Sequence, residues 1–516
     1  MVIVGAGMGG LVCALLLADR GIRVTLVEAA AEPGGKIRQL VVDGSPIDSG
    51  PTVFTMRWVF DEIFATVGLS TDALLQLRPL QILARHAWRN CDQRLDLFAD
   101  VAQSADAIGR FSSASEAQGF LRFCAKAREI YTHLEPPYMR STKPNLLRMV
   151  GGLGIGGLGA LAGLGPLANY WQLLGRYFSD PRLRQLFGRY ATYCGASPWA
   201  APATLMLIAH VEQDGVWALN GGMHALPKAL AGQILSRGGT IRYRTPCERI
   251  LFQHGRATGV LLEGGEILDA DAVVFNGDTS ALAQGLLGEA VRRSVPPLGR
   301  NRRSLSALTW SVKTATSGFP LTRHNVFFDD DYASEFDHIF RQRRLPAKGT
   351  VYVCAQDRTD DTPLAAGRER LLCLVNAPAD GDVKPFNPME VGPCEQQSLK
   401  LLSQCGLNID LTTAQCIRTT PTDFNRIFPG TGGALYGRAS HGWMTPFQRQ
   451  GASSRLPGLY LAGGSVHPGP GVPMAAISGR LAAETVMADL DLTSKSNLGR
   501  TSGGMSTPSV TMASTR

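Results

Sequence analysis

The chain has 516 residues, of which 44% are hydrophobic and 18% charged. This length predicts about two folded domains, and the spread of 58 glycines and 30 prolines among apolar runs excludes a wholly disordered protein. The net charge of +8 would suit an anionic membrane surface, but the arginines are scattered rather than grouped with aromatics, so we expect no nucleic-acid partner.

The first predicted strand, residues 2–4, is a β-branched run typical of a strand buried on both faces. It leaves no room for a signal segment, so we do not expect secretion. The run Gly5-Ala6-Gly7-Met8-Gly9-Gly10 then fits G-x-G-x-x-G. Gly5 permits the tight turn, Gly7 lets the backbone approach a pyrophosphate, and Gly10 lets the next helix, residues 11–19, pack closely. That helix would present free N–H groups to phosphates.

A second strand, residues 23–27, ends at Glu28, which lies 18 residues after Gly10. An acidic side chain at this position accepts hydrogen bonds from a ribose diol. The order of strand, glycine turn, helix, strand and acid therefore predicts dinucleotide binding. It does not by itself distinguish NAD from FAD.

The next two segments, residues 32–36 and 47–52, resemble the glycine-glycine-basic segment and following turn of the phytoene desaturase and amine oxidase flavoproteins. The resemblance implies FAD, with Gly35 and Lys36 near its pyrophosphate and Gly50-Pro51-Thr52 near the flavin ring. Lys36 could instead be a solvated loop charge.

The first long insertion, residues 101–220, is predicted to be largely helical, as in 102–111 and 116–133. Within it, residues 149–175 carry no charge and are long enough to span a bilayer, but eight glycines between 151 and 165 argue against a regular spanning helix. A flap or interfacial anchor, a buried loop and a membrane span remain open for this segment.

Further strands are predicted at residues 240–243, 247–251, 257–262 and 272–275. The family resemblance implies that the backbone around Cys247 contacts adenine. Residues 277–456 mix loops with strands such as 350–355 and 371–377, which predicts a sheet-floored pocket facing the flavin.

Near the C-terminus, a buried strand at 459–461 leads into Gly463-Gly464-Ser465, and a helix of small residues begins near Val472 and runs to about 487. Its first turn would present its positive end to the reduced flavin. The resemblance places Gly464, Ser465, Val472, Pro473 and Met474 near the cofactor. Ser465 stands where the family often has an acid, which leaves the ribityl contact open. Residues 492–516 are expected to be disordered.

The predicted fold is α/β, with a discontinuous Rossmann-like FAD-binding domain and an α+β substrate domain. The FAD-binding domain takes residues 1–100, 221–290 and 456–491. The substrate domain, expected to associate with a membrane, takes residues 101–220 and 291–455.

Residues 50–60, 84–88 and 463–474 resemble the carotenoid desaturases of the phytoene desaturase type. The first two are particularly similar to the hydroxyneurosporene (methoxyneurosporene) desaturases, the 1-hydroxycarotenoid 3,4-desaturases. The resemblance implies an FAD-dependent enzyme that introduces a C3–C4 double bond into a 1-hydroxy- or 1-methoxy-carotenoid. Alternatives are a phytoene or neurosporene desaturase, an FAD-dependent carotenoid isomerase, an amine oxidase, and a flavin-binding membrane partner without turnover.

Neither insertion contains a nucleophile motif, and single histidines such as His86, His210 and His224 are more often structural than catalytic. From their expected nearness to the flavin, His467, Arg57 and Trp58 are candidates to bind the substrate hydroxyl. His467 could equally support the backbone of its Pro/Gly loop. No catalytic base is assigned.

The ten cysteines form no C-x-x-C pair and no cluster at metal-ligand spacing, so we expect reduced thiols, a cytoplasmic location and no metal. With the family resemblance, this predicts a peripheral enzyme on the inner (photosynthetic) membrane. It would draw its carotenoid from that membrane and pass electrons to a quinone or to oxygen.

Overall fold

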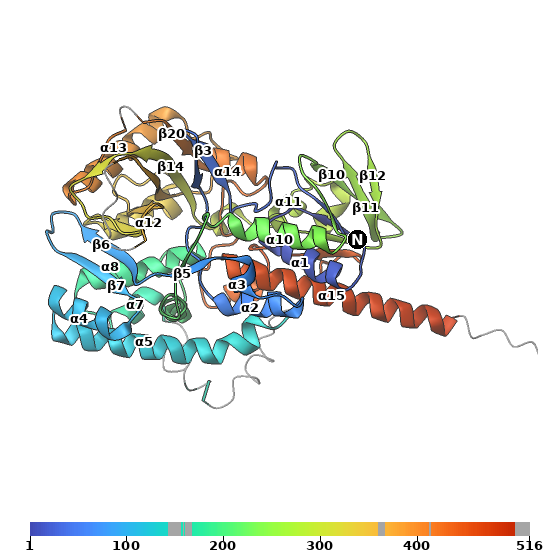
Figure 1. Ribbon diagram of the computed structural model, residues 1–516, viewed down its shortest axis with the longest axis horizontal. Coiled ribbons are helices and arrows are strands. Elements are labelled where there is room, and N and C mark those ends of the chain that lie inside the picture. Colours follow the sequence, from blue (N-terminus) through green and yellow to red (C-terminus); the bar gives the residue numbers. More distant parts are fainter. Residues whose placement is uncertain (143–155, 158, 160–167, 360–366, 412–413, 501–516) are drawn as a thin grey trace, which may run out of the picture.

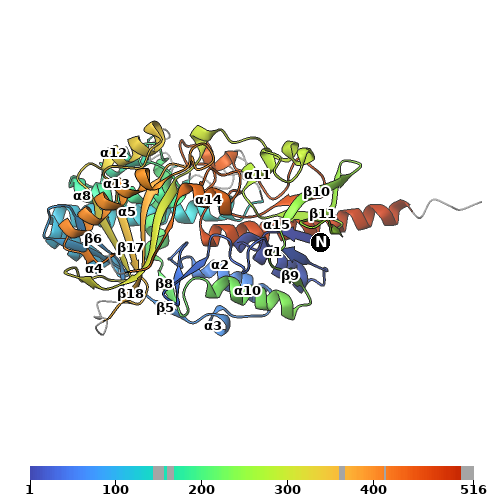
Figure 2. The ribbon, with the colours of Figure 1, turned by 90° about the horizontal axis from the view of Figure 1, so that it is seen from above.

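The computed structural model describes residues 1–142, 156–157, 159, 168–359, 367–411 and 414–500. The main chain forms two units that lie side by side, one around a parallel sheet and one around a larger mixed sheet (Figures 1 and 2). All ten cysteines lie in the described ranges and are free.

The first unit is built on a five-stranded parallel sheet in the order β21 (Leu459–Leu461), β13 (Val273–Phe275), β1 (Val2–Val4), β2 (Thr25–Val27) and β9 (Thr240–Arg242). Strands β1, β13 and β21 are apolar on both faces because both faces are covered, whereas the edge strand β9 is partly exposed. Ile3 packs towards the helices α1 (Met8–Asp19), α10 (Ala225–Ser236) and α15 (Val472–Arg500). Its neighbour Val2 packs towards a three-stranded sheet of β10 (Cys247–Gln253), β11 (Arg256–Leu262) and β12 (Ile267–Asp269).

The predicted end of the last helix needs correction. Helix α15 continues to Arg500, so residues 492–500 are helical rather than disordered. The physical reason is that proline and glycine, which weaken a helix, occur only three times between Val472 and Arg500. Pro473 and Gly499 lie near the two ends, and Gly479 lies at a close packing contact. Residues 501–516, the rest of the expected tail, lie outside the described residues.

The second unit contains a seven-stranded sheet in the order β20 (Cys416–Thr419), β14 (Ser306–Thr314), β18 (Glu369–Ala377), β17 (Val351–Ala355), β16 (His324–Phe328), β6 (Ile82–Trp88) and β7 (Arg94–Phe98). Its neighbouring strands are antiparallel except for β16 and β6. Alternate residues of β18 show why its middle is apolar on both faces: Leu371 and Cys373 pack on the side of α13 (Pro388–Gln404), whereas Leu372 and Leu374 face a cavity.

One predicted domain boundary is wrong. Strands β6 and β7 belong to the seven-stranded sheet, so residues 82–98 are part of the substrate unit and not of the FAD-binding unit, as the range 1–100 assumed. Every residue of β6 is buried, because the strand pairs on both sides, with β7 and with β16. Strands β6 and β7 form a hairpin that belongs to the second unit, because β6 pairs with β16, which lies far along the chain.

The first insertion is helical as predicted, with α4 (Val101–Phe111) and α5 (Ala114–Leu134). Most of residues 149–175, for which a flap or interfacial anchor, a buried loop and a membrane span were left open, lie outside the described residues. Its end forms α7 (Tyr170–Leu174), in which Tyr170, Leu173 and Leu174 are buried. Among the described residues, no helix is both long and apolar enough to cross a bilayer.

The remaining α-helices and strands complete the two units. They are β3 (Gln39–Val42), β4 (Ser45–Asp48), α2 (Arg57–Thr66), α3 (Thr71–Leu74), β5 (Leu77–Pro79), α8 (Pro181–Gly188), α9 (Leu207–Gln213), β8 (Trp217–Leu219), α11 (Thr279–Ala283), β15 (Thr316–Ser317), α12 (Tyr332–Phe336), β19 (Asn408–Ile409) and α14 (Pro421–Ile427).

Candidate functional site

A single cavity of about 1370 Å³ connects the two units. One part is lined by the glycine turn between β1 and α1 and by the start of α15. The other is lined by strands β14, β17 and β18, which form the predicted sheet floor. Because small-molecule sites usually measure roughly 300–1,000 Å³, this cavity has room for a cofactor and a second molecule.

The glycine turn has the geometry of a phosphate cradle. Gly5 adopts φ +100°, and its carbonyl accepts a hydrogen bond of 3.0 Å from Nδ2 of Asn276. A Cβ on Gly10 would lie 2.2 Å from the Gly5 carbonyl oxygen, and one on Gly7 would lie 2.8 Å from Asn276 Nδ2. No side chain caps α1, whose first residues Met8 and Gly9 line the cavity. Its free N–H groups therefore meet the cavity at the positive end of the helix.

Glu28 follows β2 and lines the same part of the cavity. Its Oε2 accepts a hydrogen bond of 2.6 Å from the Ala6 N–H, and its Oε1 accepts one of 2.8 Å from the Ala30 N–H. These two bonds fix the carboxylate next to the glycine turn. Each oxygen keeps a lone pair for the hydroxyls of a ribose diol.

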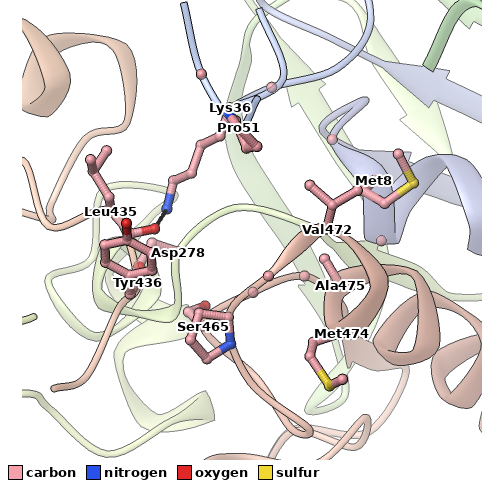
Figure 3. A pocket seen from close by; sticks show the side chains of 18 of the residues that line it. Met8, Lys36, Pro51, Asp278, Leu435, Tyr436, Ser465, Val472, Met474 and Ala475 are labelled. Atoms are coloured by element: carbon pink, nitrogen blue, oxygen red, sulfur yellow. Dashed lines mark hydrogen bonds between the residues drawn. The ribbon is translucent and has the colours of Figure 1, made fainter. Parts of the chain in front are cut away.

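The other predicted cofactor residues gather around the same space. Figure 3 shows the first turn of α15, with Val472, Met474 and Ala475, facing Met8 of α1. Every cofactor residue predicted from the sequence lines the cavity except Gly10, whose role is close packing of α1: Gly5, Gly7, Glu28, Gly35, Lys36, Gly50, Pro51, Thr52, Cys247, Gly464, Ser465, Val472, Pro473 and Met474. The residues present thus fit a dinucleotide cofactor.

Lys36 is not a solvated loop charge. Its Nζ donates a hydrogen bond of 2.6 Å to the Leu435 carbonyl and lies 5.5 Å from the centre of the Phe428 ring. Burial lowers the pKa of the amine, and the nearby Asp278 carboxylate opposes this effect. In Figure 3 the amine points towards Leu435 and Asp278, so a contact with the pyrophosphate stays a prediction.

Arg57 and Trp58, expected to bind the substrate hydroxyl, do not line the cavity. Met56 adopts a left-handed conformation, φ +49°, and α2 then leads away from Thr55 and Met56, which do line it. Arg57 forms ion pairs with Asp61 and Asp72 at 3.3 and 2.5 Å. Trp58 Nε1 donates to the Tyr131 hydroxyl at 3.0 Å.

His467 also lies behind the cavity wall rather than in it. Its Nε2 is 2.8 Å from the Tyr138 carbonyl oxygen, and its ring meets the Tyr138 ring edge to face at 4.8 Å. Burial lowers the pKa of His467 to about 4. The contacts of this neutral imidazole are those of a residue that supports the backbone of its Pro/Gly loop, and not those of a residue that binds the substrate hydroxyl.

Several polar residues of the cavity were missed by the sequence analysis. Asp278 Oδ1 caps α11 through the Ser280 N–H, at 2.9 Å, while its buried Oδ2 has no hydrogen-bond partner among the described residues. No motif surrounds the others, which come from four segments far apart in the chain: Arg189 and Tyr193 on one 3-10 turn, Glu212, Tyr352 and Arg449. The turn at 276–278, directly after a buried strand, was a usable signal for Asp278.

The chain is similar to known flavoproteins and carotenoid desaturases. The family model for flavin containing amine oxidoreductases matches residues 8–487. A hydroxyneurosporene desaturase of Rubrivivax gelatinosus is 64% identical over 511 residues, 99% of this chain and 97% of that protein. Another, of Cereibacter sphaeroides, is 44% identical over 490 residues, 95% of this chain and 98% of that protein.

The solved structure of an oxidoreductase from Methanosarcina mazei has the same fold. It superposes with a TM-score of 0.59 at 17% identity, covering 94% of this chain and 99% of that one. The cofactor is FAD, which the glycine turn, Glu28 and the first turn of α15 would hold. The chain belongs to the flavin-containing amine oxidoreductase family, in its carotenoid desaturase branch, and is an FAD-dependent oxidoreductase.

Proposed function

We propose that the chain is a carotenoid 3,4-desaturase that introduces a C3–C4 double bond into a 1-hydroxy- or 1-methoxy-carotenoid. The observation that carries this proposal is the single cavity that continues from the dinucleotide cradle onto an apolar sheet floor. Leu372 and Leu374 of β18 supply this floor, and Leu205, Ile208 and Val211 add apolar surface from the helical side. Such a lining suits a long hydrocarbon and excludes water from the reacting bond.

The bound flavin supplies the hydride acceptor of the reaction. The substrate loses a hydride from one carbon of the C3–C4 bond and a proton from the other, and its conjugated chain spreads the positive charge that forms between these events. The protein therefore has to position the polyene and exclude water rather than provide a strong base. Thr52, beside the expected flavin position, is held by a hydrogen bond of 2.7 Å between its Oγ1 and the Tyr352 hydroxyl.

We further propose that the substrate comes from a membrane surface, that the enzyme is a cytoplasmic protein bound peripherally to the inner (photosynthetic) membrane, and that a quinone or oxygen takes the electrons. The net charge of +8 supports attraction to anionic lipid. Trp443 supports an interfacial contact, since it lines the cavity yet is 48% exposed. Vesicle flotation of the wild type and of Trp443→Ser, each with anionic and with neutral vesicles, tests the membrane contact. Trp443→Ser should reduce the amount of protein recovered with anionic vesicles. Equal recovery of both proteins with both kinds of vesicle would contradict the proposal.

The activity is tested with purified FAD-loaded protein and 1-hydroxyneurosporene in liposomes, with flavin-stripped protein as the control. A shift of absorption to longer wavelength with a product two hydrogens lighter supports desaturation. A change of spectrum at constant mass would indicate isomerisation. Oxidation of amines, with no change in 1-hydroxyneurosporene, neurosporene or phytoene, would favour an amine oxidase and overturn the proposal.

A further inference from the structure

The apolar part of the cavity contains two charged side chains that cofactor binding does not account for. Arg189 begins the 3-10 turn Arg189–Cys194, and Glu212 lies near the end of α9. Both line the cavity. Tyr190, which directly follows Arg189 in this turn, donates its hydroxyl hydrogen to Glu212 and so links the two segments. Burial raises the pKa of Glu212, and the Tyr190 hydroxyl and Arg189 oppose this effect.

Arg189 keeps hydrogen-bond donors for a ligand. Among the described residues its guanidinium has one hydrogen-bond partner, the Tyr193 hydroxyl, at 2.7 Å from Nη1. The guanidinium carbon lies 5.1 Å from the centre of the Tyr193 ring and 5.4 Å from that of the Tyr352 ring. These two rings hold the cation in place without neutralising it, because neither is a carboxylate. Its remaining N–H groups are therefore positioned but unused.

Glu212 provides the complementary acceptor. One carboxylate oxygen, Oε2, accepts a hydrogen bond from the Tyr190 hydroxyl. In the described part of the chain the other oxygen has no hydrogen-bond donor and is not enclosed by protein atoms. A donor and an acceptor that line the same cavity match an alcohol, which can accept one hydrogen bond and donate another.

The position of this pair also matches the reaction. Tyr352, which contacts Arg189, holds Thr52 of the turn expected beside the flavin ring. In a 1-hydroxy-carotenoid the oxygen-bearing carbon C1 is separated by one carbon from C3, where the new double bond begins. A substrate placed for reaction at C3 and C4 must therefore carry its oxygen close to the flavin, where Arg189 lies.

We propose that Arg189 and Glu212 form the subsite that binds the C1 oxygen of the carotenoid. Arg189 donates a hydrogen bond to this oxygen, and Glu212 accepts the hydroxyl hydrogen. This subsite rests on the proposed desaturase function and specifies which substrates it favours. A methoxy group can take the Arg189 bond alone, and an unsubstituted end leaves both charged groups without a partner. The order of preference is therefore hydroxy, then methoxy, then unsubstituted.

The test compares kcat/KM for 1-hydroxyneurosporene, 1-methoxyneurosporene and neurosporene in FAD-loaded protein. Binding of the three corresponding 3,4-desaturated products, followed by quenching of tryptophan fluorescence, gives a second readout that needs no turnover. Arg189→Met should reduce the preference for hydroxylated over unsubstituted carotenoid about 10- to 100-fold in both readouts. Arg184→Met is the matched control, because Arg184 also stacks on an aromatic ring, Trp171 at 4.7 Å, but does not line the cavity.

Glu212→Met tests the acceptor separately. It should remove the preference for hydroxy over methoxy, whereas Tyr190→Phe, which removes only the bond that supports Glu212, should retain most of it. If Arg189→Met fails to bind FAD, the substrate preference of Glu212→Met still tests the subsite. Wild-type protein that desaturates all three carotenoids equally, or variants that keep the wild-type ratios, would overturn the subsite while leaving the desaturase function intact. Wild-type protein that desaturates none would overturn both.

Discussion

Gln356 holds the backbone of Asp48 from both sides. Its Oε1 accepts the Asp48 N–H at 2.9 Å, and its Nε2 donates to the Asp48 carbonyl at 2.8 Å. Gln356 directly follows β17, and Asp48 ends β4, two residues before the Gly50-Pro51-Thr52 turn. The pair therefore ties the turn expected beside the flavin to the sheet that floors the substrate cavity.

Gln356→Leu should lower both stability and turnover, because it leaves the buried N–H and carbonyl of Asp48 without partners. Each unsatisfied group costs about 1–3 kcal/mol. Thermal unfolding and kcat measure the two effects. Gln103→Leu, on the exposed side of α4, is the control and should behave as wild type. A normal melting temperature for Gln356→Leu would show that the bidentate contact does not stabilise the junction.

Gly10→Ala should abolish FAD binding, since its Cβ would lie 2.2 Å from the Gly5 carbonyl oxygen and displace α1 from the glycine turn. Gly232→Ala, within helix α10, has no heavy atom within 4 Å of its added Cβ and should bind FAD normally. Bound flavin per polypeptide, measured by absorbance after gel filtration, distinguishes them. Full flavin occupancy in Gly10→Ala would contradict the packing role assigned to this glycine.

Arg57→Ala should leave the kcat and the order of substrate preference unchanged. Its ion pairs with Asp61 and Asp72 are partly exposed, and such pairs contribute about 0–1 kcal/mol to stability. Steady-state rates with hydroxylated and unsubstituted carotenoids provide the measurement. A selective loss of activity on the hydroxylated substrate would restore Arg57 as a substrate contact and argue against its position outside the cavity.

Stability should fall as the pH drops below about 6.5. Burial lowers the pKa of His441 to about 4 and those of His86 and His324 to about 3, so these rings stay neutral in the folded chain. In the unfolded chain they take up protons below their ordinary pKa of about 6.5. The unfolded state then binds more protons, and each histidine lowers the free energy of unfolding by up to about 1.4 kcal/mol per pH unit until its folded pKa is reached.

Urea unfolding between pH 7 and pH 5 measures this slope. His441→Gln should reduce it, because a glutamine oxygen can accept the hydrogen bond that His441 Nε2 now accepts from the Ser197 N–H, at 3.0 Å, without titrating. An exposed histidine gives the control: His254→Gln, in a surface turn, should leave the slope unchanged. If both variants show the wild-type slope, His441 does not contribute to the pH dependence.

The amino-acid sequence alone predicted those parts of the site that are formed by residues close together along the chain. The turn at Gly5 to Gly10 and Glu28 could be predicted, because the spacing of strand, turn and helix is local and the chemistry of a phosphate cradle fixes the residue types. The hairpin β6–β7 was assigned to the wrong unit because its partner β16 lies far along the chain, and a strand's pattern does not identify its partner. Arg189 and Glu212 were missed for the same reason, because only the folded chain brings them to the same cavity.

The order of strands in the parallel sheet has a consequence for biosynthesis. The central strand β1 leaves the ribosome long before the edge strand β21 and helix α15, which packs against α1. Until they emerge, β13 has an unpaired edge and the apolar surface of α1 is uncovered, a state that is prone to aggregate. FAD can therefore be bound only after β21 and α15 have been made, and truncations before residue 459 should yield insoluble, colourless protein.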